Sequence, residues 1–350
     1  MDPFRLTDDA LLVLDQSALP REERWVEVRS AAKMAEAIAG LRVRGAPAIG
    51  IAGAIGIWLE AERIAESEGG RAARGSVSAS RMKALEASAD LLRAARPTAA
   101  NLAWAVARAM GAGARGAAAA DPRAWTAPIR AEALAIWEED RGHSRAMARY
   151  GRQLFATERR FLTHCHTGGL ATGGGGTALG VLLEIHRSGR PIQVWATETR
   201  PLLQGARLTA WELENEGVPV RLIVDSAAAY VMERRKVEAV VVGADRIARN
   251  GDLANKIGTL PLALAARDLG IPFVAVAPST TIDPGCASGD EIPIEERSPE
   301  ELLGYQGIPV APSGLPAENP AFDVTPCRLV TAIVTERGIH RGPAFDLGGC

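Results

Sequence analysis

The chain has 350 residues, of which 47% are hydrophobic and 23% charged, and its 40 lysines and arginines nearly balance its 42 acidic residues. A chain of this length can form two domains, or one large domain with an extension, around a well-buried core. The balanced charge excludes the strong basic field that gathers nucleic acid or an anionic membrane surface, and we expect neither as a partner.

The first residues predict no targeting or membrane segment. MDPFRLTDDALLVLDQS lacks a basic stretch followed by an apolar core, and no apolar run approaches the roughly 20 residues of a membrane helix. The cysteines are widely spaced without a CxxC pair, which is typical of a reducing compartment. They are Cys165, Cys286, Cys327 and Cys350. We therefore expect a cytoplasmic protein with free thiols.

Residues 1–125 are predicted to form a mainly helical N-terminal domain. Apolar residues recur with helical spacing in AAKMAEAIAGL, AIGIAGAIGIWLEAERIAE, SRMKALEASADLLRAA and ANLAWAVARAMGAG. Segments rich in glycine and proline separate these helices. One of them, residues 66–80, is expected to be a mobile surface loop.

Residues 126–350 are predicted to form a Rossmann-like C-terminal domain, which makes the fold class α/β. A long linking helix is expected over residues 126–155, followed by alternating strands and helices. The expected strands are RFLTHC, IQVWATE, VRLIVDS, AVVVGAD and PFVAVAP, and the expected helices are TALGVLLEIHRSG, ARLTAWELENEG, AAAYVMERRK and NKIGTLPLALAARDLG. Repeated βα units of this length predict a doubly wound parallel sheet.

Polar side chains end several of these predicted strands. They are Cys165, Glu198, Asp225, Asp245 and residues 279–281. Ligands of doubly wound sheets bind beyond the carboxyl ends of the strands. Polar strand ends alone are common, but so many at one edge favour an enzyme.

The stretch THCHTGGLATGGGGTALG, residues 163–180, invites a test for nucleotide binding. A G-x-G-x-x-A spacing is satisfied by Gly173, Gly175 and Ala178, with Glu198 about 20 residues further on. The dinucleotide fingerprint should begin directly after the strand, whereas here seven residues separate Cys165 from Gly173, which disfavours a nicotinamide cofactor. No GK[ST] ending is present, which excludes a nucleotide P-loop. A glycine-rich turn before a helix can still offer N–H groups to a sugar phosphate.

His164, Cys165 and His166 include side chains that bind zinc. Adjacent residues of a strand point to opposite faces, and no second ligand pair lies at usable spacing, so we expect no metal site. A cysteine at a strand end is more often buried packing than a reactive group. The N-terminus of the helix expected after Cys165 would favour a thiolate or a bound anion. Cys165 therefore remains a candidate catalytic residue.

Asp245 and three cations are further candidates. Helices could shield Asp245 from water, and burial raises the pKa of an aspartate and suits a general acid; the alternative is a helix cap. Arg44 lies in RGAPAIG at a turn before a helix, while Arg96 and Lys256 lie beside a turn or helix start. Each cation alone is weak evidence, but three around one strand edge would suit a phosphorylated small substrate.

Several longer motifs occur in a characteristic order: RGAPAIG, ARPTAANLAWAV, THC with a glycine-rich turn, ATETRPLLQGARLTAWEL, VVGADRIARNGDLANKIGT, APSTTID, IPIEERSPEE and NPAFDVTP. Together they resemble the methylthioribose-1-phosphate isomerase family of the methionine salvage pathway. The resemblance runs from LDQSALP at 14–20 to TAIVTERG at 331–338, nearly the whole chain. The same superfamily contains regulatory subunits of the exchange factor for eukaryotic translation initiation factor two, and ribose-1,5-bisphosphate isomerases, so fold alone cannot assign a function.

The resemblance implies a homodimer that uses no metal or nucleotide cofactor. It implies that Cys165 and Asp245 are the catalytic pair. It also implies that the substrate's phosphate and sugar are bound by Arg44, Gly45, Ala46, Arg96, Gln204, Asn255 and Lys256. All of these are present at the matching positions, which argues against a regulatory subunit, in which catalytic residues need not persist.

The implied reaction is the aldose–ketose isomerisation of 5-methylthioribose 1-phosphate to 5-methylthioribulose 1-phosphate. The alternatives are an isomerase of 5-deoxyribose 1-phosphate or ribose 1,5-bisphosphate, and a non-catalytic relative that binds sugar phosphates or nucleotides. One departure bears on this choice, because the family usually has Asn after THC, where His166 and Thr167 follow here. Histidine donates a hydrogen bond as asparagine would but titrates near neutrality, which leaves the substrate preference and pH optimum open.

Overall fold

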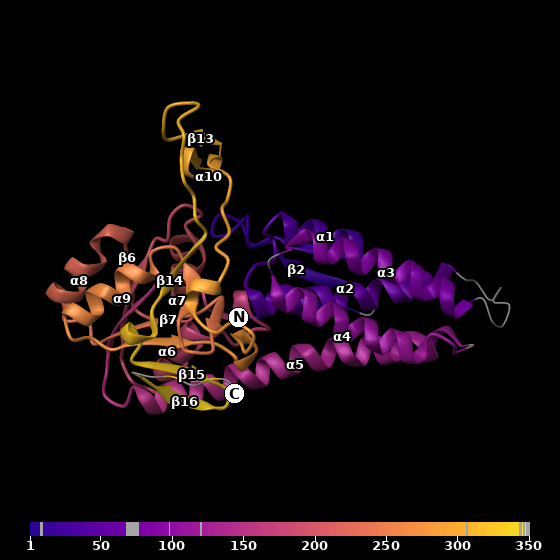
Figure 1. Ribbon diagram of the computed structural model, residues 1–350, viewed down its shortest axis with the longest axis horizontal. Coiled ribbons are helices and arrows are strands. Elements are labelled where there is room, and N and C mark those ends of the chain that lie inside the picture. Colours follow the sequence, from indigo (N-terminus) through magenta and orange to yellow (C-terminus); the bar gives the residue numbers. More distant parts are fainter. Residues whose placement is uncertain are drawn as a thin grey trace. The chain divides into compact units, whose positions relative to one another are not determined.

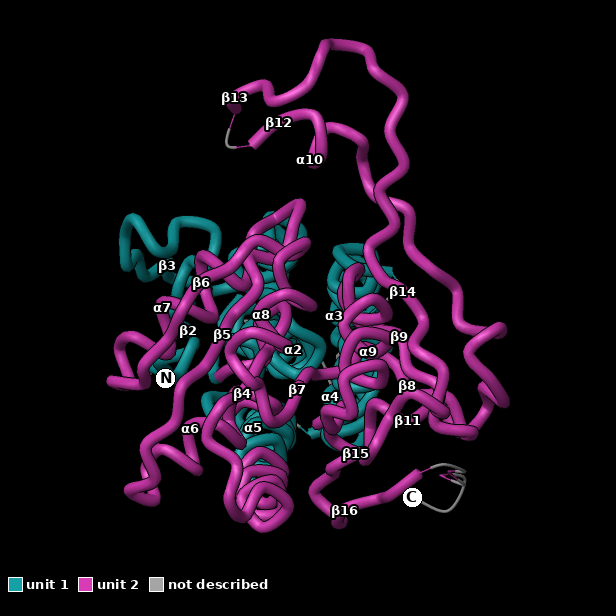
Figure 2. The backbone as a smooth tube through the Cα atoms, turned by 90° about the vertical axis from the view of Figure 1, so that its left-hand side faces the viewer, with its two compact units in different colours: residues 1–142, 169–175 teal, residues 143–168, 176–350 magenta. Residues whose placement is uncertain are grey.

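The structure is a computed structural model of the chain (Figure 1). It describes residues 1–7, 10–67, 77–97, 99–119, 121–305, 307–342, 345 and 347. The chain divides into two compact units, drawn in teal and magenta in Figure 2. Unit 1 comprises residues 1–142 and 169–175, and unit 2 comprises residues 143–168 and 176–350.

Unit 1 is mainly helical, as predicted. Its helices are α1 (Ala31–Ala39), α2 (Ala46–Ser67), α3 (Val77–Ala95), α4 (Ala100–Gly116) and the first part of α5 (Pro122–Leu154), which continues into unit 2. The predicted loop over residues 66–80 lies largely outside the described residues. None of the described helices is long and apolar enough to cross a membrane.

An antiparallel sheet precedes the helices of unit 1, and the sequence analysis missed it. Its strands are β1 (Phe4–Leu6), β2 (Leu11–Leu14) and β3 (Trp25–Val28), paired in that order. Each strand has at most four residues, too few for a period-2 pattern to stand out from helical spacing. The strands therefore depend on the packing of Phe4, Leu11 and Val13 into the helical core.

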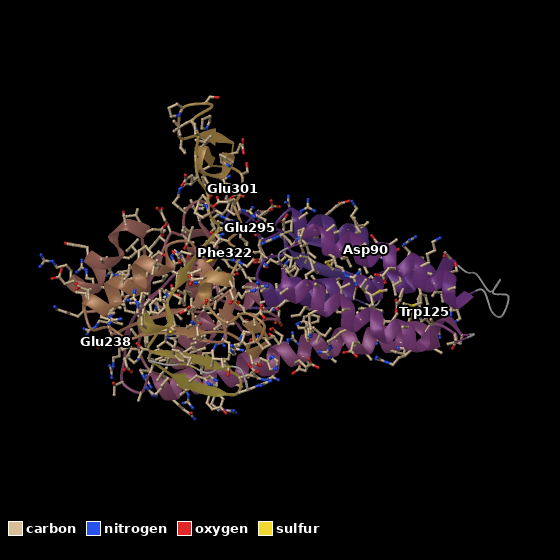
Figure 3. The ribbon with its side chains drawn as sticks, viewed as in Figure 1. Asp90, Trp125, Glu238, Glu295, Glu301 and Phe322 are labelled. Atoms are coloured by element: carbon tan, nitrogen blue, oxygen red, sulfur yellow. The ribbon has the colours of Figure 1, made fainter. Side chains whose placement is uncertain are left out.

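Glycines let the helices of unit 1 approach closely. A Cβ atom on Gly50 would lie 3.0 Å from the Asn101 carbonyl oxygen, and one on Gly53 would lie 2.4 Å from Leu102 Cδ1. These contacts bring α2 against α4. At the far end of the unit the buried Trp125 (Figure 3) donates its indole N–H to the Gly113 carbonyl at 3.1 Å. The indole thus fixes the start of α5 to α4.

Unit 2 is built on a seven-stranded sheet, which confirms the predicted Rossmann-like α/β fold. The strand order is β16-β15-β10-β7-β4-β5-β6, parallel except for the edge strand β16. The strands are β4 (Arg160–Thr163), β5 (Gln193–Thr197), β6 (Val220–Ile223), β7 (Ala239–Val242), β10 (Phe273–Val276), β15 (Ala332–Thr335) and β16 (Gly338–Arg341). The five strands expected from the sequence are β4, β5, β6, β7 and β10.

The two faces of this sheet belong to separate cores. Along β7, Val240 and Val242 pack in one core and Val241 in the other, as the period-2 alternation of a strand requires. One core is covered by α6 (Ala178–Arg187), α7 (Ala210–Asn215) and the end of α5, and the other by α8 (Ala228–Arg235) and α9 (Thr259–Asp268). Burial on both faces explains why these strands are continuously apolar.

A second sheet corrects one predicted helix. NKIGTLPLALAARDLG was expected to be helical from Asn255, but Asn255 and Lys256 end strand β9 (Leu253–Lys256), and α9 starts at Thr259. β9 pairs with β8 (Arg246–Ala248) and β14 (Phe322–Thr325), and β8 also pairs with β11 (Ile282–Asp283). The cause is the Asn-Gly turn between β8 and β9, a strong hairpin signal, in which Gly251 has a φ of +89°.

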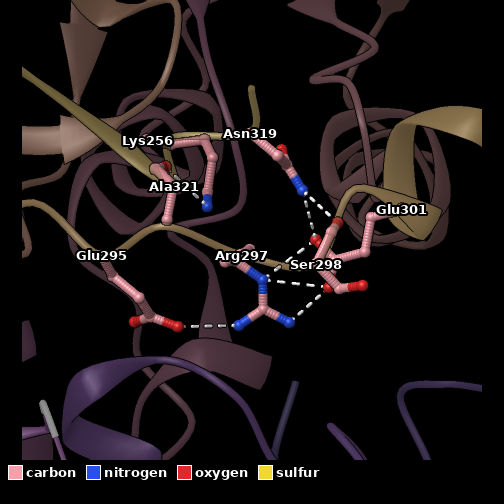
Figure 4. A network of polar contacts seen from close by, with 7 residues as sticks. All are labelled: Lys256, Glu295, Arg297, Ser298, Glu301, Asn319 and Ala321. Atoms are coloured by element: carbon pink, nitrogen blue, oxygen red, sulfur yellow. Dashed lines mark hydrogen bonds and ion pairs between the residues drawn. The ribbon is translucent and has the colours of Figure 1, made fainter. Parts of the chain in front are cut away.

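An arm extends from unit 2 beyond the second sheet (Figures 1 and 2). It carries the short elements α10 (Glu300–Leu303), β12 (Gly304–Tyr305) and β13 (Ile308–Pro309). Ion pairs hold its base, where Arg297 lies between Glu295 and Glu301 and the Asn319 amide reaches Ser298 and Glu301 (Figure 4). Burial alone would raise the pKa of Glu301, but hydrogen bonds from Arg297 and Asn319 outweigh it and hold the pKa below its ordinary value.

Candidate active site

Cys165 follows β4 in a strained backbone conformation. Its φ is +61° and its residue is 6% exposed. A non-glycine residue in this left-handed region costs on the order of 1–3 kcal/mol, so neighbouring groups must hold it there. The Thr199 hydroxyl oxygen accepts the Cys165 N–H at 2.9 Å, and the Thr209 hydroxyl donates to the Cys165 carbonyl at 2.6 Å. Buried threonines thereby fix both the N–H and the carbonyl group of Cys165.

His164 has a structural role on the other side of the same segment. Its Nε2–H donates to the Ile257 carbonyl at 2.9 Å, and its Nδ1 accepts from Thr197 Oγ1 at 2.6 Å. Burial lowers the pKa of this imidazole. Because both ring nitrogens are occupied by protein partners, His164 joins the end of β4 to the segment after β9. Among the described residues no cluster of three or more His, Cys, Asp or Glu could hold a metal ion.

Asp225 and Glu198 follow their strands as predicted, but the Asp225 carboxylate binds backbone N–H groups of the loop after β5. Its two carboxylate oxygens accept the N–H groups of Thr199 and Arg200, each at 2.7 Å. Asp225 therefore fixes the loop that presents Thr199 to Cys165. Glu198 is half-buried, and burial together with the nearby Asp225 charge raises its pKa.

Gln204 lies buried at the start of a π-helical turn, Gly205–Thr209, that leads into α7. Among the described residues no donor reaches its side-chain Oε1. Buried acceptors are nearly always satisfied, so this oxygen suits a donor from a ligand, such as a sugar hydroxyl. A Cβ atom on Gly205 would lie 1.8 Å from the Thr197 carbonyl oxygen. Only glycine there lets the turn approach the end of β5.

Asp245 departs from the expectation of a buried carboxylate, because its side chain is exposed. After β7 the chain turns directly into β8, and the Asp245 N–H donates to the Ala254 carbonyl at 2.9 Å. The residue therefore lies where the chain passes from the large sheet to the small one. No helix follows it, so the alternative of a helix cap is also wrong.

Asn255 and Lys256 lie at the end of β9. The buried Asn255 donates its side-chain amide to Thr259 Oγ1 at 3.0 Å. Lys256 donates to the Ala321 carbonyl at 2.9 Å (Figure 4), and its Nζ lies 4.8 Å from the centre of the Phe322 ring, labelled in Figure 3. The hydrogen bond between His164 and Ile257, the residue after Lys256, ties this pair to the cysteine segment.

Asp323, beside the same pair, was not predicted as a site residue. Its carboxylate accepts the N–H groups of Gly258 and Leu260 at the start of α9. Burial raises its pKa to about 6, although those N–H donors and the Lys256 charge act in the opposite direction.

The remaining predicted binding residues belong to unit 1. Gly45 has a φ of +96°, and a Cβ atom on it would lie 2.4 Å from the Ala171 carbonyl oxygen. Ala46 is the first residue of α2, so Arg44 and Gly45 lie at a helix N-terminus, the arrangement expected for anion binding. Arg96 lies in the turn between α3 and α4, where its carbonyl accepts the Ala99 N–H at 3.0 Å.

Residues 169–175 of the glycine-rich stretch are bound within unit 1. The Gly173 carbonyl accepts hydrogen bonds from Trp137 Nε1 at 2.9 Å and Arg141 Nε at 3.0 Å. The Gly173 N–H donates to the Asp140 carboxylate at 2.6 Å. A carboxylate at this N–H leaves no room for a pyrophosphate, which removes the dinucleotide reading. The Gly173 N–H is likewise not among the groups that the glycine-rich turn could offer to a sugar phosphate.

The residues that hold Cys165 in place, Thr199 and Thr209, were not predicted from the sequence. The signal was present as three threonines in ATETRPLLQGARLT. Single-sequence patterns do not distinguish a threonine that bonds a neighbouring backbone from one in a strand or helix. The structure places Cys165, Gln204, Asp245, Asn255 and Lys256 in unit 2, where the His164–Ile257 hydrogen bond joins the segments of Cys165 and Lys256. Unit 1 contains Arg44, Gly45, Ala46 and Arg96.

The fold and the strand-end residues define a Rossmann-like α/β protein with polar side chains at the carboxyl edge of its sheet. A family model described as the initiation factor 2 subunit family matches residues 42–342. The chain belongs to this family.

Relatives across the full length carry one enzyme name. Methylthioribose-1-phosphate isomerases from Pelotomaculum thermopropionicum and Anaeromyxobacter sp. (strain K) are each 51% identical over 98% of this chain, and the alignments cover 92% and 95% of those proteins. The crystal structure of 5-methylthioribose 1-phosphate isomerase from Pyrococcus horikoshii has a TM-score of 0.88 at 41% identity and covers 98% of this chain and 93% of that one. A structure described as translation initiation factor eIF-2B, subunit delta, from A. fulgidus has a TM-score of 0.85 at 38% identity, covering 98% and 96%.

Proposed function

We propose that this protein is an aldose–ketose isomerase that converts 5-methylthioribose 1-phosphate to 5-methylthioribulose 1-phosphate in methionine salvage. The observation that carries the proposal is the 51% identity, over 98% of the chain, to proteins named for this activity. The buried Cys165 in a left-handed conformation supports it, because strain of this kind concentrates at functional sites.

The substrate defines what the site must do. In an aldose 1-phosphate the anomeric oxygen carries the phosphate, so the sugar ring cannot open spontaneously. The enzyme must assist the cleavage of the bond between C1 and the ring oxygen and then transfer hydrogen from C2 to C1. Neither step requires a redox cofactor, because the oxidation at C2 is balanced by the reduction at C1.

We assign the proton transfers to Asp245 and Cys165. Asp245 protonates the ring oxygen as the bond between this oxygen and C1 breaks. The Cys165 sulfur then takes the proton from C2, and the electrons of the C2–H bond form a C1–C2 double bond. Loss of the O2 proton and protonation of C1 then complete the ketose. Because Asp245 is exposed in the single chain, we propose that the bound substrate itself excludes water from this carboxylate.

We assign phosphate binding to cations and a helix N-terminus, and sugar binding to two side-chain amides. The phosphate is bound by Arg44, the start of α2 and the cations Arg96 and Lys256, and the sugar hydroxyls by Gln204 and Asn255. Guanidinium groups and helix N-termini both favour phosphate oxygens. The Gln204 Oε1 suits a sugar hydroxyl because no described donor satisfies it. We further propose a cytoplasmic homodimer.

The second candidate is a non-catalytic regulatory protein. The observation in its favour is the high TM-score of the A. fulgidus structure described as an initiation factor subunit. Cys165 and Asp245 are both present here, which favours the enzyme.

One assay separates these candidates. Purified protein is incubated with 5-methylthioribose 1-phosphate without added cofactor, and the ketose product is followed; parallel reactions contain 5-deoxyribose 1-phosphate and ribose 1,5-bisphosphate. The proposal is supported if 5-methylthioribose 1-phosphate is turned over with the highest kcat/KM of the three sugars. Absence of product from all three favours the regulatory protein. Substrate deuterated at C2 distinguishes transfer of the C2 hydrogen as a proton from its transfer as a hydride. A proton exchanges with solvent, whereas a hydride is retained at C1.

A further inference from the structure

Thr209 is connected to Cys165 on one side and to His166 on the other. Its hydroxyl lies 2.6 Å from the Cys165 carbonyl oxygen and 3.0 Å from His166 Nδ1. All three residues are at most 6% exposed, with Thr209 at 1%. Water therefore does not replace these contacts readily, and each polar atom depends on its protein partner.

The direction of both hydrogen bonds follows from the chemistry of the groups. A carbonyl oxygen only accepts, so the single Thr209 hydroxyl proton is donated to Cys165. The Thr209 oxygen must then accept from His166, which places a proton on Nδ1. The bond from His166 thus orients the hydroxyl that grips the cysteine carbonyl.

Glu212 lies beside the other nitrogen of His166, within ion-pair distance but without hydrogen-bond alignment. Its Oε2 lies 3.3 Å from His166 Nε2, and both side chains are fully buried. The bond to Thr209 requires a proton on Nδ1, and a second proton on Nε2 would leave Nδ1 a donor. Gly168 makes room for the carboxylate, because a Cβ atom there would lie 2.3 Å from Glu212 Oε2.

We propose that Thr209, oriented by the buried His166–Glu212 pair, is a positioning residue that keeps Cys165 in its left-handed conformation and its sulfur in place for the reaction. The inference rests on the proposed role of Cys165 in catalysis. It also gives a function to His166, which stands where the resemblance leads us to expect asparagine. An asparagine side chain has an N–H donor close to the position of Nδ1, so both residues can orient Thr209.

The test removes the hydroxyl and keeps the shape of the side chain. Thr209→Val should lower kcat at least about tenfold with KM changed less than about twofold, because small displacements of a reacting group act on the chemical step. Thr209→Ser and His166→Asn, which keep the hydroxyl and the donor, should retain kcat within about threefold. The matched control is Thr163→Val, since the buried Thr163 hydroxyl has no hydrogen-bond partner among the described residues.

A second measurement reports on the cysteine without turnover. The alkylation rate of Cys165 by iodoacetamide, followed by mass spectrometry, should rise at least about threefold in Thr209→Val, as a residue released from its backbone restraint becomes more accessible. The rate should be unchanged in Thr163→Val. If Thr209→Val does not fold, as judged by its thermal unfolding, His166→Leu removes the same orientation and gives the same test.

Wild-type kcat and alkylation rate in Thr209→Val would overturn the proposal, as would equal effects of Thr209→Val and Thr163→Val, or a Thr209→Ser variant as impaired as the valine. Failure of the proposed function looks different. In that case Cys165→Ser retains full activity, or the wild type makes no ketose, while a raised alkylation rate in Thr209→Val still supports the positioning role.

Discussion

The two halves of the stretch THCHTGGLATGGGG are held in place by opposite means. Residues 163–168 belong to unit 2. Among them, the hydroxyls of Thr199 and Thr209 hold Cys165 in a left-handed backbone conformation that residues other than glycine rarely adopt. Residues 169–175 belong to unit 1, where the Gly173 backbone forms hydrogen bonds with the side chains of Trp137, Asp140 and Arg141.

Cys165 and the loop of residues 169–175 differ in what their backbones tolerate. At Cys165 a side chain is present despite its backbone cost, as the proposed role of the thiol would require. In the loop, the glycines are selected for lacking a side chain, because neighbouring groups occupy the space where a Cβ atom would lie. Substitutions at Cys165 should therefore affect catalysis, and substitutions in the loop or at Gly45, which packs against Ala171 of the loop, should affect stability.

The largest effect is expected at Asp245. Replacing it with Asn removes the proton donor to the ring oxygen and should lower kcat by about 100-fold or more while leaving substrate binding largely intact. Steady-state kinetics and a binding titration with the sugar phosphate measure the two quantities. Activity above about a tenth of wild type would contradict the general-acid assignment.

Cys165→Ser should also reduce kcat strongly, by about 100-fold, because a serine hydroxyl is a poor substitute for a thiolate as proton acceptor. The matched control is Cys286→Ser. Cys286 is equally buried, at 6% exposure, but it lies in a small apolar cluster with Ala248 and Ile292. Equal kinetic effects of the two substitutions would mean that Cys165 is structural.

Gly45→Ala tests the stability side of the comparison. The added Cβ atom would meet the Ala171 carbonyl oxygen at a φ of +96°, which should lower the free energy of unfolding by about 3 kcal/mol. Gly189→Ala is the control, because Gly189 has a φ of +86° but no atom within 4 Å of the added group; strain alone should cost about 1 kcal/mol. Urea denaturation of both variants measures the difference, and equal losses would show that the contact with Ala171 is soft.

The smallest effect is a pH dependence of stability due to His164. Burial lowers the pKa of its imidazole, with the Lys256 charge acting in the same direction and the Ile257 carbonyl and Asp225 opposing it. The unfolded chain then binds a proton below its ordinary pKa of about 6.5 while the folded chain stays neutral. This contribution to stability is complete above that pH and is lost as the pH falls toward the folded pKa.

Urea midpoints of the wild type and of His164→Gln, compared between about pH 8 and about pH 5.5, test this contribution. The variant should have the flatter profile on the acid side. Parallel profiles would show that other groups, such as Asp323 with its raised pKa, dominate the acid response. Asp323 acts in the opposite sense, because a raised folded pKa of about 6 lowers stability as the pH rises toward that value.

The sequence by itself determined the fold class and the main candidates for the site. Buried parallel strands are continuously apolar and end in polar residues, so β4, β5, β7 and β10 and the residues after them could be located from local patterns. The glycine at position 45 and the helix after it were likewise visible, because a Gly-Ala-Pro turn before an apolar run is a local signal.

Only the tertiary structure decided how Cys165 is held and where Asp245 and the glycines lie. The hydrogen bonds to Cys165 come from Thr199 and Thr209, which are 34 and 44 residues away in sequence. Whether residues 169–175 offer their N–H groups to a ligand depended on Asp140, 33 residues before Gly173. Short-range periodicity carries no information about such partners, because it reports which face of an element is buried and not which side chain from another element lies against it.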